Sequence, residues 1–339
     1  MAVYTDSPDY AEALLPEALA SELTPTAETG STTGLVHTLL RPEKGLHAAP
    51  GDVSSWRHLL LTDFAPRSNY DSLIDLARGP GVPDRVASLA GAGTGFHGFK
   101  GRTWAAEEGN LHLSVHLTPL RPVERFEVAF TVLAALSMAE ALDGVEGLEG
   151  EAGVKWVNDV VLDGAKVGGV LAYTQTRGEV VSSAVLGLGL NVESAPTLPP
   201  TPFVPRTTRV CDALAAENGP ADLQREVFLA LLAAVERNYG TLLEEGYGPL
   251  LERYRSRSVV LGREVTICPE DADDISTPLA GGRVVAMGEG LELYVDGQAT
   301  PLPRGRLVLE EEAKPSAEEA PDDSSEFSAP PLVGGTIRD

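Results

Sequence analysis

The stretch "GVKWVNDVVLDGAKVGGVLAYTQTRGEVVSSAVLGLGLNV", residues 153–192, decides the fold. Its apolar residues come in the short runs that are typical of strands. The pair Asp163-Gly164 supplies the positive φ angles of a tight hairpin, and a second hairpin is expected near Gly178. Because strands joined by tight turns run antiparallel, this stretch predicts a mainly antiparallel sheet.

Further strand and helix patterns precede and follow this stretch. We expect strands over 58–63, 84–91 and 110–117, and one or more helices in each of 68–79, 125–142 and 220–258. The strand over 110–117 alternates apolar residues with His112, Ser114 and His116, which predicts one buried and one polar face. The whole pattern predicts an α+β fold with a mixed, mainly antiparallel sheet and flanking helices.

Composition shifts divide the chain into four parts. Residues 1–56 are weakly patterned, and we interpret them as an N-terminal extension, draped on the next domain or partly disordered, without a helix-turn-helix. Residues 57–256 form the main domain. The short strands of residues 257–310 predict a small β-barrel. Residues 311–339 are acidic and rich in proline and serine, which predicts a disordered tail.

Bulk properties exclude several classes of protein. The net charge of -24 argues against a nucleic-acid coat and against an anionic membrane surface as partners. The longest uncharged apolar run, residues 128–139, is shorter than the roughly 18–20 residues that span a bilayer. Cys211 and Cys268 are far apart and are expected to be free thiols in a reducing compartment. We therefore expect a cytoplasmic protein.

A glycine-rich segment, "GFHGFKGRTW" (residues 95–104), precedes the strand over 110–117. Its three glycines bracket Lys100 and Arg102, and backbone N–H groups between glycines can point at an anion. The segment is either a phosphate-holding loop or a surface turn. It does not fit the P-loop pattern, because a strand follows it rather than a helix.

Lys155 lies within an expected strand, between Val154 and Trp156. It either sits at a sheet edge with its amine in water or points into a site. Asn158 and Asp159 follow and form a common turn pair.

Glycines recur inside the later strands, at Gly168-Gly169 and at Gly187 and Gly189. A glycine inside a strand often marks a place where another group approaches the backbone closely. Together with Lys155 and the glycine-rich segment, these positions favour one shared cleft.

Three motifs carry a resemblance to a known family. "KWVNDVVLDGAKVGGVL" followed by "GLGLNV" closely resembles the central motifs of the biotin protein ligases. "GFHGFKGRTWAAEEGNLHLSVHL" resembles their glycine-arginine loop, and "SNYDSLIDLARGPG" resembles the start of their first catalytic-domain helix. The match covers roughly residues 58–195, and the combination is specific to the biotin/lipoyl protein ligase superfamily.

The resemblance implies a biotin/lipoyl ligase-like catalytic domain at residues 57–256 and an SH3-like C-terminal β-barrel. It implies an ATP-dependent biotin–[carboxyl carrier protein] ligase that acts through biotinyl-5′-AMP. The substrates would be biotin and ATP with Mg²⁺, and the partner would be a biotin carboxyl carrier domain or a similar acceptor protein. Nucleic acid and membrane are not expected as partners, and members of the family often form homodimers.

The resemblance also implies roles for particular residues. Lys155 and Arg102 would be catalytic, with Lys155 bridging the carboxylate and the α-phosphate. The biotin-binding residues would be Ser68, Asn69, Thr94, His97, Gly98, Lys155, Gly169 and Gly187. The nucleotide-binding residues would be Phe99, Lys100, Gly101, Arg102, Trp104, Asn158 and Asn191. No set of metal ligands is predicted.

The chain departs from the family pattern at four positions. His97 and Phe99 replace two arginines of the loop, Val157 replaces a proline and Thr94 replaces a glutamine. These changes leave two alternatives open: a ligase for lipoate or another carboxylic acid, and a non-catalytic ligand-binding homologue.

Overall fold

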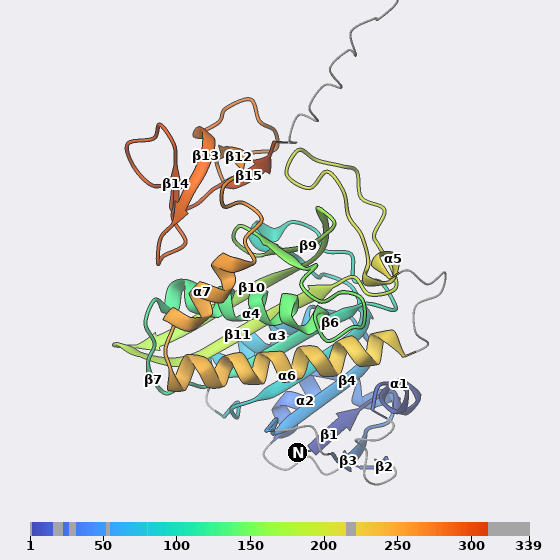
Figure 1. Cartoon of the computed structure of the whole chain (residues 1–339). Helices are drawn as coiled ribbons and strands as arrows, with labels where there is room; N and C mark the ends of the chain where they lie inside the picture. Colours follow the sequence, from blue (N-terminus) through green and yellow to red (C-terminus); the bar gives the residue numbers. More distant parts are fainter. Residues whose placement is uncertain are drawn as a thin grey trace, which may run out of the picture. The chain divides into compact units, whose positions relative to one another are not determined.

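The computed structural model describes residues 2–15, 23–26, 32–51, 55–79, 81–214 and 222–310 (Figure 1). The chain up to Leu309 forms one compact unit. The predicted acidic tail, residues 311–339, lies outside the described residues, and so do parts of the predicted N-terminal extension.

One mixed sheet runs through most of this unit. Its strands follow the order β2-β3-β1-β4-β5-β6-β11-β10-β9-β8, and β7 pairs with the start of β11. β4 is parallel to β1 and to β5, whereas the other neighbouring pairs are antiparallel. The prediction of a mixed, mainly antiparallel sheet is therefore confirmed. The strands are β1 (Ala2–Thr5), β2 (Thr24–Pro25), β3 (His47–Pro50), β4 (His58–Ala65), β5 (Val86–Gly93), β6 (Leu111–Leu117), β7 (Arg121–Pro122), β8 (Gly153–Lys155), β9 (Asp159–Leu162), β10 (Ala165–Arg177) and β11 (Val180–Leu190).

Both predicted hairpins form. Asp163 and Gly164 join β9 to β10 with φ angles of 46° and 67°, and Gly178 joins β10 to β11 with a φ of 62°. These left-handed angles are the reason that glycine occupies two of the three positions. The second hairpin is long, because β10 and β11 pair from Gly168 to the turn.

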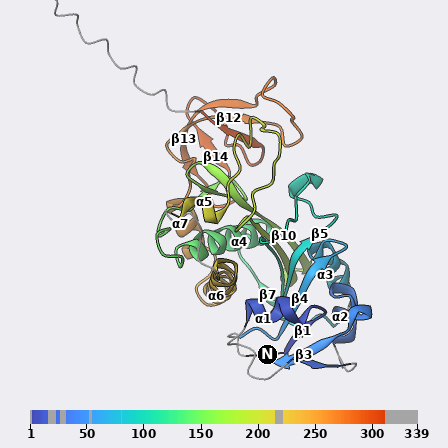
Figure 2. The same cartoon turned by 90° about the vertical axis from the view of Figure 1, so that its right-hand side faces the viewer.

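Helices cover both faces of the sheet (Figure 2). Along β4, Leu59 and Leu61 join the large core with α4 and α6, whereas Leu60 points to the other side and joins a smaller core with α2 and α3. In the described part of the chain, no helix combines the length and the apolar character that a membrane crossing requires. The helices are α1 (Pro8–Leu14), α2 (Thr33–Leu39), α3 (Asn69–Ala77), α4 (Phe126–Leu142), α5 (Val210–Ala213), α6 (Leu223–Glu244) and α7 (Gly248–Ser256).

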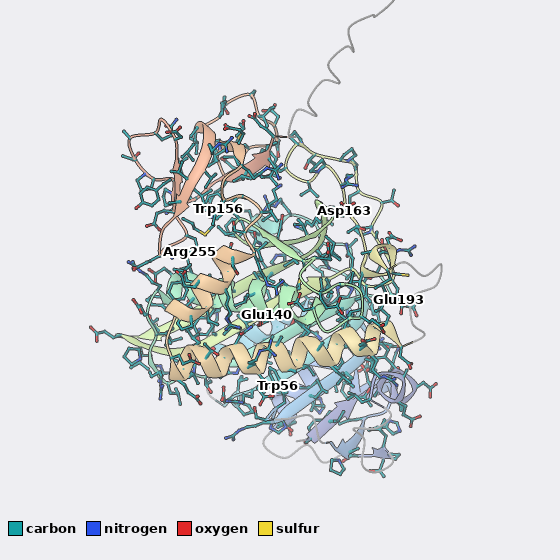
Figure 3. All side chains as sticks on the ribbon, in the orientation of Figure 1. Trp56, Glu140, Trp156, Asp163, Glu193 and Arg255 are labelled. Carbon is teal, nitrogen blue, oxygen red and sulfur yellow. The ribbon has the colours of Figure 1, made fainter. Side chains whose placement is uncertain are left out.

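A polar cluster ties the buried helix α4 to α6 and α7. Glu140 of α4 accepts from Arg253 at 2.7 Å, from Arg237 at 2.8 Å and from the Asn238 amide at 3.0 Å (Figure 3). Because both oxygens of the nearly buried carboxylate are paired, the three helices are held at fixed spacing without leaving a charge unsatisfied.

Strand β6 is buried on both faces, so the prediction of a polar, half-buried face is wrong. The histidines that alternate with its apolar residues are covered as well. His116 contacts the Pro83 carbonyl and the Ser183 hydroxyl, both at 2.9 Å. The alternation was real, but α3 and neighbouring loops cover the second face, and local hydrogen bonds satisfy its polar groups.

The N-terminal segment is part of the sheet rather than draped on it. β1 pairs with both β3 and β4, and Val3 has no exposed surface. Asp6, also buried, accepts from the backbone and the guanidinium of Arg41 at 2.7 and 3.1 Å. The draped or disordered interpretation is therefore wrong for these residues, because strands of two to four residues are too short to show alternation. The domain boundary near residue 57 stays a prediction.

Four antiparallel strands form a second, C-terminal sheet in the order β14-β13-β12-β15. Trp156 and Arg255, both labelled in Figure 3, contact this part of the chain. Trp156 donates from its indole to the carbonyl of Leu291, between β13 and β14, at 2.7 Å, and Arg255 donates to the carbonyl of Met287, at the end of β13, at 2.6 Å. The SH3-like barrel stays a prediction. The strands are β12 (Glu264–Cys268), β13 (Ala280–Met287), β14 (Leu293–Val295) and β15 (Arg306–Leu309).

Val3→Asp should destabilise the whole unit, because it places an unpaired charge in the large core. We expect the free energy of unfolding to fall by about 3 kcal/mol or more, measured by urea denaturation. Thr24→Asp, which adds the same charge on the exposed strand β2, serves as the control and should change it by less than about 0.5 kcal/mol. A Val3→Asp protein with wild-type stability would contradict the integration of β1.

Candidate active site

A cleft of about 910 Å³ lies beside β10 and β11. Its wall includes residues 96–105 of the glycine-rich segment, residues 155–159 between β8 and β9, most of the proline-rich segment 196–207, and residues 303–307 of the C-terminal sheet. Segments that are far apart in the sequence thus meet at one cavity.

The glycine-rich segment folds as a short hairpin. The backbone N–H of Gly98 donates to the Arg102 carbonyl at 2.6 Å, and that of Trp104 donates to the Phe96 carbonyl at 3.3 Å. A single 3-10 turn, η3 (Phe99–Gly101), reverses the chain. The segment is therefore an organised part of the cleft wall, and a bare surface turn does not describe it.

Two glycines of β11 allow aromatic rings to lie against the backbone. A Cβ atom on Gly189 would lie 2.6 Å from the Trp104 ring, and one on Gly187 would lie 3.0 Å from the Tyr70 ring. Both rings line the cleft. The expectation that these glycines mark a close approach is confirmed, and the approaching groups are side chains of this chain.

A buried histidine fixes the plane of Trp104. The indole N–H of Trp104 donates to Nδ1 of His112 at 3.2 Å, and Nε2 of His112 donates to the Glu107 carbonyl at 3.2 Å. Burial lowers the pKa of His112 to about 4, so its ring is neutral near pH 7. The ring also packs against Phe96, with 5.4 Å between centroids.

Lys155 ends β8, the last strand of the sheet, and its half-buried amine donates to the backbone carbonyl of Phe203. Lys155 thus lies on an edge strand, but its amine points into the cleft and bonds a carbonyl rather than reaching water, so the interpretation that it points into a site is the one that holds. Burial lowers the pKa of Lys155; Asp159 opposes this shift, and the cations Lys166 and Arg306 add to it.

Further cations line the same cleft. Lys166 pairs with Asp159 at 2.6 Å, and the Arg306 guanidinium lies 3.8 Å from the centroid of the Phe203 ring. Arg102 also borders the cavity. This local positive charge stands within a chain of net charge -24, so it makes the cleft suited to anions.

Most residues that the sequence assigned to a site line this cleft. They are Ser68, His97, Gly98, Phe99, Lys100, Gly101, Arg102, Trp104, Lys155, Asn158, Gly169, Gly187 and Asn191. Asn69 and Thr94 are not in its lining. The buried Asn69 amide donates to the Ser88 hydroxyl at 2.9 Å, and the Thr94 hydroxyl donates to the Pro66 carbonyl at 2.8 Å.

The two asparagines of the cleft differ in what they leave for a ligand. Asn158 donates to the Val170 carbonyl at 2.8 Å, and Asn191 donates to the Thr208 carbonyl at 3.1 Å. The side-chain oxygen of Asn191 is buried and finds no hydrogen-bond partner among the described residues. Because buried acceptors are normally paired, this oxygen is an exception among the polar atoms of the cleft.

The described ranges contain neither a cluster of metal-ligating side chains nor a cysteine in the cleft lining. No group of three or more His, Cys, Asp or Glu side chains that could hold a metal ion occurs there. Cys211 and Cys268 are free, as expected, and neither lines the cleft.

Many lining residues were not assigned to the site from the sequence. Among them are Tyr70, His112, Asp159, Lys166, Phe203 and Arg306. Lys166 carried a usable signal, because it stands just before the paired glycines of the same hairpin. Phe203 and Arg306 carried none, because only the folding of the proline-rich segment and of the C-terminal sheet brings them to the cleft.

Gly189→Ala should displace Trp104, because the added methyl group would lie too close to the indole ring. We expect a changed tryptophan emission spectrum and greater iodide quenching. The control is Gly240→Ala, which makes the same chemical change on α6 where nothing lies within 4 Å, and it should leave both signals unaltered. Identical spectra for the wild type and Gly189→Ala would contradict the packing of Trp104 on β11.

Known proteins resemble the chain over this same region. Residues 82–191 match the model of the Biotin/lipoate A/B protein ligase family. The Bifunctional ligase/repressor BirA of Bacillus subtilis is 25% identical over 207 residues, which cover 61% of each chain, so less than two thirds of that relative is spanned. The Biotin–[acetyl-CoA-carboxylase] ligase of Mycobacterium tuberculosis is 36% identical over 152 residues, 43% of this chain and 53% of that protein.

A solved structure has the same fold. The biotin protein ligase from Aquifex aeolicus in complex with biotin and ATP superposes with a TM-score of 0.57 at 21% identity, covering 76% of this chain and 100% of that chain. The matched family region contains the glycine-rich segment, Lys155 and the glycines of β10 and β11 that build the cleft. Residues 82–191, which contain these parts of the cleft, are therefore similar to the Biotin/lipoate A/B protein ligase family.

Proposed function

We propose that the protein is an ATP-dependent ligase that attaches biotin to a lysine of a carboxyl carrier protein through biotinyl-5′-AMP. One observation carries the proposal: the Lys155 amine, the glycine-rich segment and the glycine-lined strands border a single cleft. The names of the matched relatives support biotin as the acid and an acetyl-CoA carboxylase component as the acceptor.

The reaction needs two anions to meet, which explains the gathering of cations. In the first step, a carboxylate oxygen of biotin attacks the α-phosphorus of ATP, the bond to the β-phosphate oxygen breaks, and pyrophosphate leaves. In the second step, the acceptor amine attacks the acyl carbon, AMP leaves with the bonding pair, and the amine loses a proton. A cation fixed where negative charge develops lowers the barrier of the first step.

Lys155 is the group best placed to stabilise that charge. Its amine lines the cleft and donates to the Phe203 carbonyl, an oxygen that a carboxylate or phosphate oxygen would replace. Arg102 would hold phosphate oxygens, and Trp104, fixed by His112, would flank the base. Lys155 therefore acts on the reacting atoms, whereas the other groups hold the nucleotide.

The remaining assigned residues divide between the two ends of the ligand. Gly98 and Gly169 would let the biotin rings approach the backbone, and Gly187 would contribute by letting the Tyr70 ring pack flat beside them, with Ser68 and His97 nearby. Asn69 and Thr94 lie outside the lining, so we leave them out of the proposed contacts.

At the nucleotide end, the unpaired Asn191 oxygen would accept from a ligand hydroxyl or from a water on the Mg²⁺ that accompanies ATP. Asn158, Lys100, Gly101 and Phe99 would complete this end. A homodimer, a cytoplasmic location and the carrier domain as partner remain predictions.

The acid can be identified directly. The purified protein is mixed with ATP and Mg²⁺ and, in separate reactions, with biotin, lipoate or octanoate, and pyrophosphate release is followed. Release with biotin alone is expected. Release with lipoate or octanoate alone would make the protein a ligase for another acid. Binding without release for any acid would make it a non-catalytic homologue, as the replacement of two loop arginines by His97 and Phe99 allows.

Lys155→Ala should lower the rate of pyrophosphate release by about 10²–10³-fold, because the developing charge loses its fixed cation. The variant should keep the wild-type far-ultraviolet circular dichroism spectrum. Lys44→Ala removes the same charge from an exposed position on the N-terminal segment and should keep full activity. Normal turnover by a folded Lys155→Ala protein would overturn the assignment.

A further inference from the structure

His97 connects the glycine-rich segment to helix α3. Its Nε2 lies 3.0 and 3.1 Å from the two carboxylate oxygens of Asp71, in the first turn of α3. Its Nδ1 lies 3.1 Å from the carbonyl oxygen of Gly98. The ring also meets Tyr70 edge-on, with 6.4 Å between ring centroids. Both ring nitrogens of His97 thus have a defined neighbour.

Those neighbours determine the protonation of the ring. A carboxylate and a carbonyl oxygen can only accept, so each ring nitrogen of His97 must carry a proton to bond its neighbour, and the imidazolium form satisfies both. His112, which lies in the same cleft, has the opposite surroundings. One of its nitrogens accepts from Trp104 and the other donates to a carbonyl, which requires the neutral ring.

The charged groups around His97 favour its proton. Hydrogen bonding to the Gly98 carbonyl raises the pKa of His97, burial opposes this shift, and Asp71 raises the pKa further. From α3 the ring faces Asp71 and also Tyr70, whose phenol is neutral because burial raises its pKa. On the segment itself, Lys100 is directed away, since its amine pairs with Glu270, in the connection between β12 and β13, at 3.2 Å.

The pair bridges two walls of the cleft. Asp71 belongs to the helix that presents Ser68 and Tyr70, and His97 belongs to the hairpin that presents Arg102 and Trp104. His97 also forms an antiparallel bridge with Thr103 across this hairpin, so the residue that contacts α3 is part of the hairpin's own pairing. Release of the pair would free the hairpin from α3 while leaving both elements folded.

We infer that Asp71 is a positioning residue, which holds the imidazolium of His97 and thereby clasps the glycine-rich segment over the acid-binding end of the cleft. An arginine, which the family pattern has where this chain has His97, would stay charged at every working pH. Because a histidine loses its proton near neutral pH, the clasp of this chain depends on protonation. The assignment of the acid to this end rests on the proposed function.

The direction of the effect follows from the raised pKa. The clasp is complete below the ordinary histidine pKa of 6.5 and is lost as the pH rises through the higher value of the folded protein. Ligand binding should therefore weaken toward alkaline pH. Because both side chains are about one third exposed, the effect should be moderate, about three- to tenfold in Kd.

Two measurements that need no ligand test the clasp itself. Histidine side-chain NMR should give His97 a pKa above 6.5 that Asp71→Asn lowers. Asp75→Asn removes the same charge one turn later on α3, where Asp75 pairs with Arg67 and Arg78, and should leave the His97 titration unchanged. The amide hydrogen exchange rates of residues 95–104 should be measured in the wild type and in His97→Arg at the same pH. The ratio of the wild-type rate to the His97→Arg rate should increase as the pH rises.

Biotin binding by calorimetry then tests the consequence. From about pH 6 to about pH 9, Kd should rise about three- to tenfold for the wild type and for Asp75→Asn, but stay nearly constant for His97→Arg. A His97 pKa at or below 6.5, or a pH-dependent Kd that is the same in His97→Arg, would overturn the inference. If biotin binds at no pH, the proposed function fails. The NMR and hydrogen-exchange results still show whether Asp71 and His97 hold the glycine-rich segment.

Discussion

The burial of helix α4 between the sheet and helices α6 and α7 is the constraint on which the rest of the structure depends. Its side chains are buried on almost every side, so each of its buried Leu, Val, Phe and Met side chains contributes about 1.5–3 kcal/mol to folding. Gly168 lets the helix approach closely, because a Cβ there would lie 2.5 Å from the sulfur of Met138. This packing sets the position of β10 and β11, and those strands present Gly187 and Gly189 to the rings of the cleft.

The sequence predicted the parts of the molecule that local chemistry determines. The hairpins at Asp163-Gly164 and Gly178 and the apolar helix α4 needed only turn geometry and periodicity, and the structure agrees. Most residues that the family motifs assigned do line the cleft, although they make up a minority of its wall. Burial of both faces of β6 could not be predicted, because alternation is the same whether or not a helix covers the polar side. Arg306 could not be predicted either, since nothing local ties it to Lys155.

The cleft is rich in cations, although the chain as a whole is acidic. Acidic residues dominate the sequence, yet Lys155, Lys166, Arg102 and Arg306 border one cavity. Their mutual repulsion costs stability in the ligand-free protein, and Asp159 offsets part of it by pairing with Lys166. An anion that enters therefore relieves an existing strain between like charges, and the overall negative charge opposes the binding of anions elsewhere on the surface.

The contact between the Lys155 amine and the Phe203 carbonyl would lower the affinity for any ligand that bonds to this amine. The amine already has an acceptor, so an anion that bound there, as proposed, would replace a neutral oxygen with a charged one rather than create an additional bond. A dissociation constant would thus report the difference in free energy between the bond to the ligand oxygen and the bond to the Phe203 carbonyl, which competes for the same amine. Loosening the proline-rich segment around Phe203 would tighten ligand binding without adding a single contact to the ligand.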